Sequence, residues 1–118
     1  MFRQLLEELL LQVEGAVAAA LMGFDGIAVE ALATDDADLD PAALGTEFAS
    51  HAAALLRTMD GLEAGPLAEV SFRAARLWGT TRMVNRQYFL ILFLRPGGNL
   101  GRGRYLLRLL APKVRQEL

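Results

Sequence analysis

The residues that could do chemistry are few in this sequence, and their types limit what they could do. His51 is the only histidine, it falls in the middle of a helical pattern, and the chain has no cysteine. A cysteine–histidine nucleophile pair, a disulfide and a cysteine-based metal site are therefore all excluded. We predict no catalytic residue, no metal and no cofactor, and we do not expect an enzyme.

Two further patterns resemble the beginnings of ligand-binding motifs. Residues 35–40 hold four aspartates, as a calcium loop does, but its sixth position is Asp40 instead of glycine and its twelfth is Thr46 instead of glutamate. The glycine-rich residues 97–103 follow a predicted strand and open a predicted helix, which is the context for phosphate binding. They match neither dinucleotide-binding nor P-loop spacing. We interpret the first pattern as a solvated loop with a helix cap, and the second as a turn with a helix cap.

Arginines alternate with aromatic residues in the second half of the chain, a pattern that could indicate nucleic-acid binding. The residues concerned are Arg73, Arg76, Arg82 and Arg86, with Phe72 and Trp78. A pI of about 5.3 argues against this interpretation, and we expect no nucleic-acid partner. The charge is also divided: residues 1–63 carry −10 from two bases and twelve acids, and residues 64–118 carry +8 from ten bases and two acids. The halves could steer a charged partner or pair with each other on folding.

Apolar periodicity and turn residues predict the elements that must position these side chains. The expected elements are a helix over 2–13, strands over 16–23 and 27–32, a helix over 41–62, strands over 67–75, 77–84 and 87–94, and a helix over 101–118. Asp40 and Pro41 predict the start of the second helix, as N-cap and first helical residue. Pro112 predicts a kink or a break in the last helix.

This order of elements predicts an α+β fold in a single domain over residues 1–118. One antiparallel five-stranded sheet with helices on both faces would bury the apolar sides, and the strand over 87–94 is apolar enough to be central. In the helix over 41–62, we expect an inward seam that runs from Leu44 to Leu62. A second face carries small residues that would let another element approach closely: Ala42, Ala43, Ala49, Ala53 and Ala54.

A tight turn at Phe24-Asp25-Gly26-Ile27 joins the first two predicted strands. It has apolar residues where a hairpin tip normally has polar ones. Two interpretations remain open. The side chains of Phe24 and Ile27 could fold back onto the sheet, or they could anchor a protein partner that Asp25 helps to orient.

The order of elements resembles the Roadblock/LC7 family, and the resemblance covers nearly the whole chain. The leading helix, the run from Gly15 to Gly26, the strand Tyr88–Leu94 and the Gly98-Asn99-Leu100-Gly101 turn before a Leu/Arg-rich helix carry it. Within the family, residues 22–27 and the tail Ala111–Arg115 resemble the bacterial MglB-type regulators and their MglC-type paralogues.

The resemblance implies a homodimer in which the central helix and the third strand pair with their two-fold copies, so that two sheets join into one. The residues expected at this interface are Ala42, Ala49, Ala53, Val70, Phe72 and Arg73. The resemblance also implies a non-catalytic adaptor of a Ras-like (MglA-type) GTPase polarity switch, one that binds an MglB-like regulator. A direct GTPase-activating protein and a platform subunit of a motor or membrane-associated complex remain as alternatives.

Nothing in the sequence predicts insertion into a membrane. The longest uninterrupted apolar runs are seven residues, whereas a membrane span needs about 20. We therefore expect a cytoplasmic protein, which partners could recruit to the cell poles.

Overall fold

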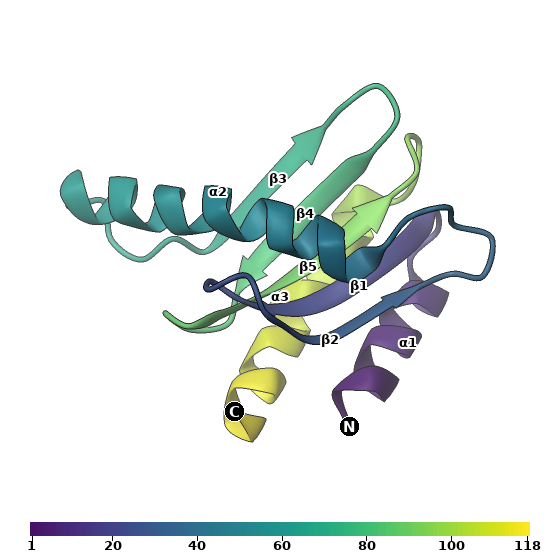
Figure 1. Ribbon diagram of the computed structural model, residues 1–118, viewed down its shortest axis with the longest axis horizontal. Helices are drawn as coiled ribbons and strands as arrows, with labels where there is room; N and C mark the ends of the chain where they lie inside the picture. Colours follow the sequence, from purple (N-terminus) through teal and green to yellow (C-terminus); the bar gives the residue numbers. More distant parts are fainter.

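The computed structural model describes all 118 residues and has the expected order of helix, two strands, helix, three strands and helix (Figure 1). The elements are α1 Phe2–Gln12, β1 Ala16–Gly23, β2 Ala28–Ala33, α2 Pro41–Gly61, β3 Glu69–Arg73, β4 Trp78–Met83, β5 Tyr88–Leu94 and α3 Leu100–Glu117. The predicted fold class is confirmed. None of the three helices is both long and apolar enough to cross a lipid bilayer.

The five strands form one antiparallel sheet in the order β2-β1-β5-β4-β3. β5 is central, as its unbroken apolar sequence predicted, and every residue of β1 is buried. β1 and β5 need apolar side chains on both faces because helices cover both faces: α1 and α3 lie on one, and α2 lies on the other (Figure 1). The β2 and β3 strands form the two edges of the sheet.

Alternation along β5 divides the hydrophobic core into two parts. Leu90, Leu92 and Leu94 pack on the side of α1 and α3, whereas Phe89 and Phe93 pack on the side of α2. All five side chains are at most 1% exposed. A fully buried side chain of this size contributes about 1.5–3 kcal/mol through the hydrophobic effect, so this strand stabilises both layers at once.

The start of α2 is set by local chemistry. The Asp40 carboxylate accepts hydrogen bonds from the backbone N–H groups of Ala42 at 3.1 Å and Ala43 at 3.2 Å, and Pro41 is the first helical residue. These partners satisfy donors that a helix N-terminus otherwise leaves free. The predicted cap is confirmed.

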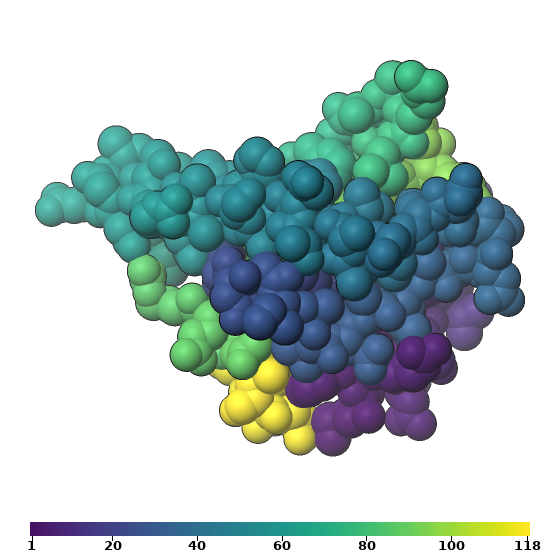
Figure 2. Space-filling view, viewed as in Figure 1, coloured from purple at the N-terminus to yellow at the C-terminus, as the bar shows by residue number.

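The other end of α2 reaches past the sheet, and here one prediction was wrong. Figure 1 shows the C-terminal half of the helix projecting from the body, and Figure 2 shows the same arm separated by a recess from the β3–β4 hairpin. Leu62, expected to face inward, is 68% exposed, because no strand lies beneath it. Leu55, Leu56 and Met59 on this arm are only half-buried.

The structure also differs from the sequence prediction at Pro112 and in the length of β3. Pro112 predicted a kink or a break, and the break is contradicted because α3 continues through it from Leu100 to Glu117. One missing N–H removes a single hydrogen bond, and packing of Leu107, Ala111 and Val114 on the sheet outweighs that loss. β3 is also shorter than the predicted strand over 67–75.

A tight backbone joint connects α1, β1, β5 and α3. Gly15 has a φ of +85° and Gly98 lies directly against it. The N–H of Asn99 donates to the carbonyl oxygen of Glu14 at 2.8 Å, and the N–H of Arg95 donates to that of Gly15 at 2.8 Å. The Asn99 side chain then caps α3 by accepting from the N–H of Arg102. The glycine-rich stretch is thus the predicted turn and helix cap.

Candidate partner-binding surfaces

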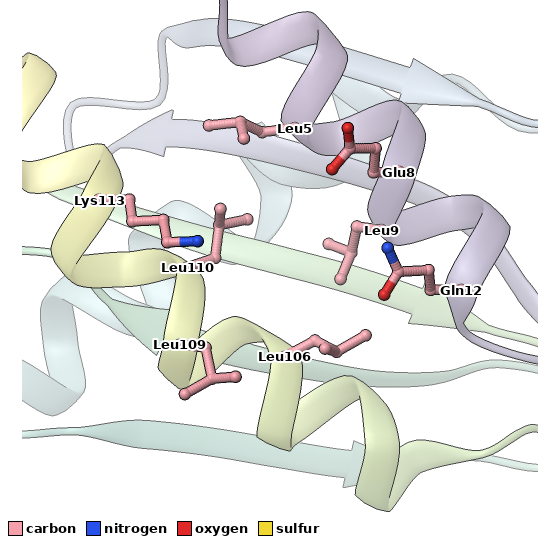
Figure 3. Close-up of a pocket in the computed structure, with 8 residues that line it drawn as sticks. All are labelled: Leu5, Glu8, Leu9, Gln12, Leu106, Leu109, Leu110 and Lys113. Atoms are coloured by element: carbon pink, nitrogen blue, oxygen red, sulfur yellow. The ribbon is translucent and has the colours of Figure 1, made fainter.

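The structure offers candidate binding surfaces and no cluster of side chains that could hold a metal ion. No group of three or more histidine, aspartate or glutamate side chains is close enough to hold a metal ion. A groove of about 160 Å³ between α1 and α3 has leucine walls, and its only ionisable groups are Glu8 and Lys113 (Figure 3). Five of its eight lining residues are hydrophobic, so the groove offers mainly apolar contact.

The β1–β2 turn is a rigid structure. The N–H of Gly23 donates to the carbonyl oxygen of Ile27 at 2.9 Å, and the Asp25 carboxylate accepts from the N–H of Ile27 at 3.0 Å. Gly26 has a φ of +90°, a conformation that favours glycine. The Thr46 hydroxyl on α2 lies 2.7 Å from the carbonyl oxygen of Gly26, to which it donates. Hydrogen bonds within the turn and from α2 therefore both hold its conformation.

The structure separates the two apolar residues of this turn. The Phe24 ring folds back onto the sheet, with its centroid 5.0 Å from that of Phe89, and is half-buried. Ile27 is 68% exposed, and Asp25 beside it is also exposed. The first interpretation, folding back onto the sheet, is confirmed for Phe24. Ile27 presents an uncovered apolar side chain, and its role in partner binding stays a prediction.

The β3 strand has one edge without a strand partner, and the hydrogen-bond pattern shows which backbone groups face it. The carbonyl oxygen of Ala68 accepts from the N–H of Met83, and the N–H of Ala74 donates to the carbonyl oxygen of Leu77. Even-numbered residues therefore bond to β4, because alternate residues of an antiparallel strand face alternate sides. The N–H and C=O groups of Glu69, Ser71 and Arg73 face the free edge.

Side chains of the β3 edge strand pack against side chains of α2. Val70 and Phe72 lie on the α2 face of the sheet, and the Phe72 ring stacks on that of Phe48 with 4.7 Å between centroids. Gly79 of β4, directly opposite, leaves room for the Phe72 ring, since a Cβ there would overlap it. The edge and the helix thus form one continuous, partly apolar surface.

The other residues expected at the dimer interface, on α2 and at the end of β3, differ in how far they are buried. Ala42 and Ala53 are half-buried on α2, and the exposed Arg73 guanidinium lies 4.5 Å from the centroid of the Trp78 ring in its own chain. Ala49 is only 1% exposed and packs in the core beneath α2. We therefore withdraw Ala49 from the expected interface, because its side chain already contacts its own sheet.

Comparison with known proteins shows to which family this fold belongs. Neither the protein-family models nor the curated proteins give a match. Among solved structures, MglC from Myxococcus xanthus is 42% identical, with a TM-score of 0.72 and a match over 99% of this chain and 98% of that one. The chain belongs to the Roadblock/LC7 family, among its MglB- and MglC-type members.

More distant structures share the fold of this Roadblock/LC7 chain. MglB from Thermus thermophilus is 21% identical with a TM-score of 0.83, and the match covers 97% of this chain and 85% of that one. A Roadblock/LC7 domain from Streptomyces avermitilis is 18% identical with a TM-score of 0.74, over 97% and 94% of the two chains. At such identities the agreement concerns the sheet and its helices.

Proposed function

We propose that this Roadblock/LC7 chain is a non-catalytic adaptor in a Ras-like (MglA-type) GTPase polarity switch. In this proposal it acts in the cytoplasm as a homodimer, binds an MglB-like regulator through the turn at Phe24, Asp25 and Ile27, and reaches the cell poles through its partners. The 42% identity to MglC over nearly the whole chain carries the proposal.

The structure supports the dimer through two surfaces that a monomer leaves incomplete. The edge of β3 presents unpaired backbone groups, and an exposed strand edge favours pairing with another strand. Leu55 and Met59 on the arm of α2 are only half-buried, and Leu62 directly after it is 68% exposed. A two-fold copy would pair the first surface and cover the second, since such interfaces use the same patch on both subunits.

The proposed contact with a regulator can be tested at Ile27. We expect Ile27→Asp to weaken binding to an MglB-like protein at least tenfold, because it places a charge where an exposed apolar side chain would be buried. The dimer and the melting temperature should change little, since Ile27 has few contacts within its own chain. Calorimetric titration would measure the affinity, light scattering the dimer, and thermal unfolding the melting temperature.

Leu11→Asp is the matched control, since Leu11 is 86% exposed on α1, away from the turn. It should leave binding within twofold of the unmodified protein. Equal losses in the two variants would contradict a role for the turn. Phe24→Ala is less informative because the Phe24 ring packs on Phe89, and its loss should lower stability.

The alternative of a direct GTPase-activating protein predicts a different result. Mixing the purified chain with an MglA-type GTPase should leave the rate of GTP hydrolysis unchanged if the chain is an adaptor, and should raise it if the chain is an activator. Failure to bind either an MglA-type or an MglB-type protein would contradict both functions. Co-purification from cells with motor or membrane subunits would favour the platform alternative.

A further inference from the structure

A second groove lies at one end of the free edge, between the start of β3, the end of β4 and the last turns of α3. It has a volume of about 260 Å³. Four of its lining residues are arginines, namely Arg82, Arg86, Arg108 and Arg115, and none is acidic. Opposite charges for these guanidinium groups must therefore come largely from outside the groove.

Two of these four arginines have no carboxylate partner within the chain, and the other two have exposed or distant ones. Arg108 and Arg115 have no carboxylate oxygen within 4.0 Å, although the Arg115 Nε donates to the carbonyl oxygen of Val84 at 2.7 Å. Arg86 pairs with Asp60 at 2.7 Å on the surface, and Arg82 lies 3.9 Å from Glu69. An exposed pair contributes little to stability, so an incoming carboxylate could replace Asp60 beside Arg86.

The adjoining recess shows how these charges act on a carboxylate. It shares Arg82 and Arg108 with the groove and adds Arg104 and Glu69. The pKa of Glu69 is held below its usual value, first by the hydrogen bond from Arg104 and then by the charges of Arg104, Arg82 and Arg108, against an opposing effect of burial. Arg82 and Arg108 line the groove as well, so their charges would favour the charged form of a carboxylate bound there too.

The floor of the groove distinguishes among the anionic partners it could take. Leu56, Pro66, Leu67 and Pro112, all at least partly exposed, contribute apolar surface to the lining of the groove. A peptide with apolar residues among its acids would use both features, since arginine binds carboxylates in bidentate geometry. A nucleic acid is disfavoured by the net charge of −10 on residues 1–63, whose Asp60 lies beside Arg86 of the groove.

We propose that this arginine groove is a docking site for a short acidic segment of a protein partner, with apolar residues interspersed among its carboxylates. The site goes beyond the proposed function, because it lies on residues other than those of the β1–β2 turn. An adaptor would thereby have a second, separate contact surface. Ile27→Asp tests binding at the turn, and arginine substitutions test binding at the groove, so failure of one proposal can be told from failure of the other.

The test uses nuclear magnetic resonance on the full chain with a synthetic probe, acetyl-Asp-Glu-Leu-Asp-Glu-Leu-Asp-Glu-amide. We expect its addition to shift backbone amide signals clustered at residues 82–86 and 108–115. A peptide with Asn and Gln in place of the acids should cause at least tenfold smaller shifts. Raising the salt concentration should weaken binding of the acidic probe, because its contacts are charge-assisted.

Variants of matched charge localise the effect. Arg86→Glu combined with Arg108→Glu should raise the dissociation constant at least tenfold, whereas Arg57→Glu combined with Arg76→Glu, at exposed positions outside the groove, should change it less than twofold. Arg108→Gln alone, with an expected threefold loss, keeps the test valid if the double variant does not fold. Equal losses in the two double variants, equal binding of the uncharged peptide, or tighter binding of an oligothymidine at the same amides would overturn the proposal.

Discussion

A Ser71→Pro variant is expected to be monomeric at concentrations where the unmodified chain is dimeric. The N–H of Ser71 faces the free edge of β3, so proline removes a donor that the proposed intersubunit ladder needs and places a ring in its path. The ladder to β4 stays complete, because it uses even-numbered residues. Proline is tolerated on edge strands for this reason.

The size of the effect follows from the symmetry of the dimer. Each substitution appears twice, and a hydrogen bond contributes about 0.5–1.5 kcal/mol. Two lost bonds and the clash of the rings should therefore weaken the dimer by about 3 kcal/mol, which is roughly a 100-fold rise in the dissociation constant. Sedimentation equilibrium over a dilution series would measure it.

Ser71→Ala is the control that separates the backbone from the side chain. It loses the hydroxyl contact between Ser71 and Thr80 at 2.8 Å, as the proline variant does, but it keeps the N–H. It should remain a dimer. A folded Ser71→Pro variant that still dimerises at low micromolar concentration would show that the subunits meet elsewhere.

Features determined by local sequence could be predicted for this protein. The unbroken apolar run of β5 predicted a central strand, and Asp40 with Pro41 predicted the start of α2. Each of these signals lies within a few residues, and its physical cause is equally local. The resemblance to the Roadblock/LC7 family rested on their order along the chain.

Features determined by distant packing could not be predicted in the same way. Of the residues expected on the inward seam of α2, Ala52 is buried, and Leu44 and Phe48 pack against the core while partly exposed. The other two buried residues of α2, Gly45 and Ala49, were not expected there. The helix approaches so closely that a Cβ on Gly45 would lie 2.5 Å from the Met22 sulfur. Sequence periodicity gives the apolar face of a helix but not its distance from the sheet. The short distance is the reason that Ala49 is buried against its own sheet.

The exposure of residues on the candidate surfaces likewise could not be predicted from the sequence. Phe24 and Ile27 are similar in hydrophobicity and share one turn, but Phe89, far along the chain, covers only the first. The charged halves of the chain do meet, through Arg86 with Asp60 and Arg95 with Asp36. Most of the remaining bases have no such partner, and only the fold shows that several of them gather around one groove.

The second large effect is expected at the joint between α1 and α3, where Gly15→Ala should lower the free energy of unfolding by about 3 kcal/mol. A φ of +85° is unfavourable for alanine by about 1–2 kcal/mol. The added Cβ would also lie 2.6 Å from the Cα of Gly98, so a backbone segment must move. Denaturant unfolding would measure the loss, which corresponds to a melting temperature about 10 °C lower.

Gly97→Ala separates these two causes, because Gly97 has a φ of +88° but no neighbouring atom within 4 Å of the place that an added Cβ would take. It should show the conformational cost alone, about 1–2 kcal/mol. The difference between the two variants then measures the close approach of Gly15 to Gly98, which fixes α1 and α3 against the same face of the sheet. Equal losses in both would show that the joint is free to widen, and that the positions of α1 and α3 depend on their leucine contacts instead.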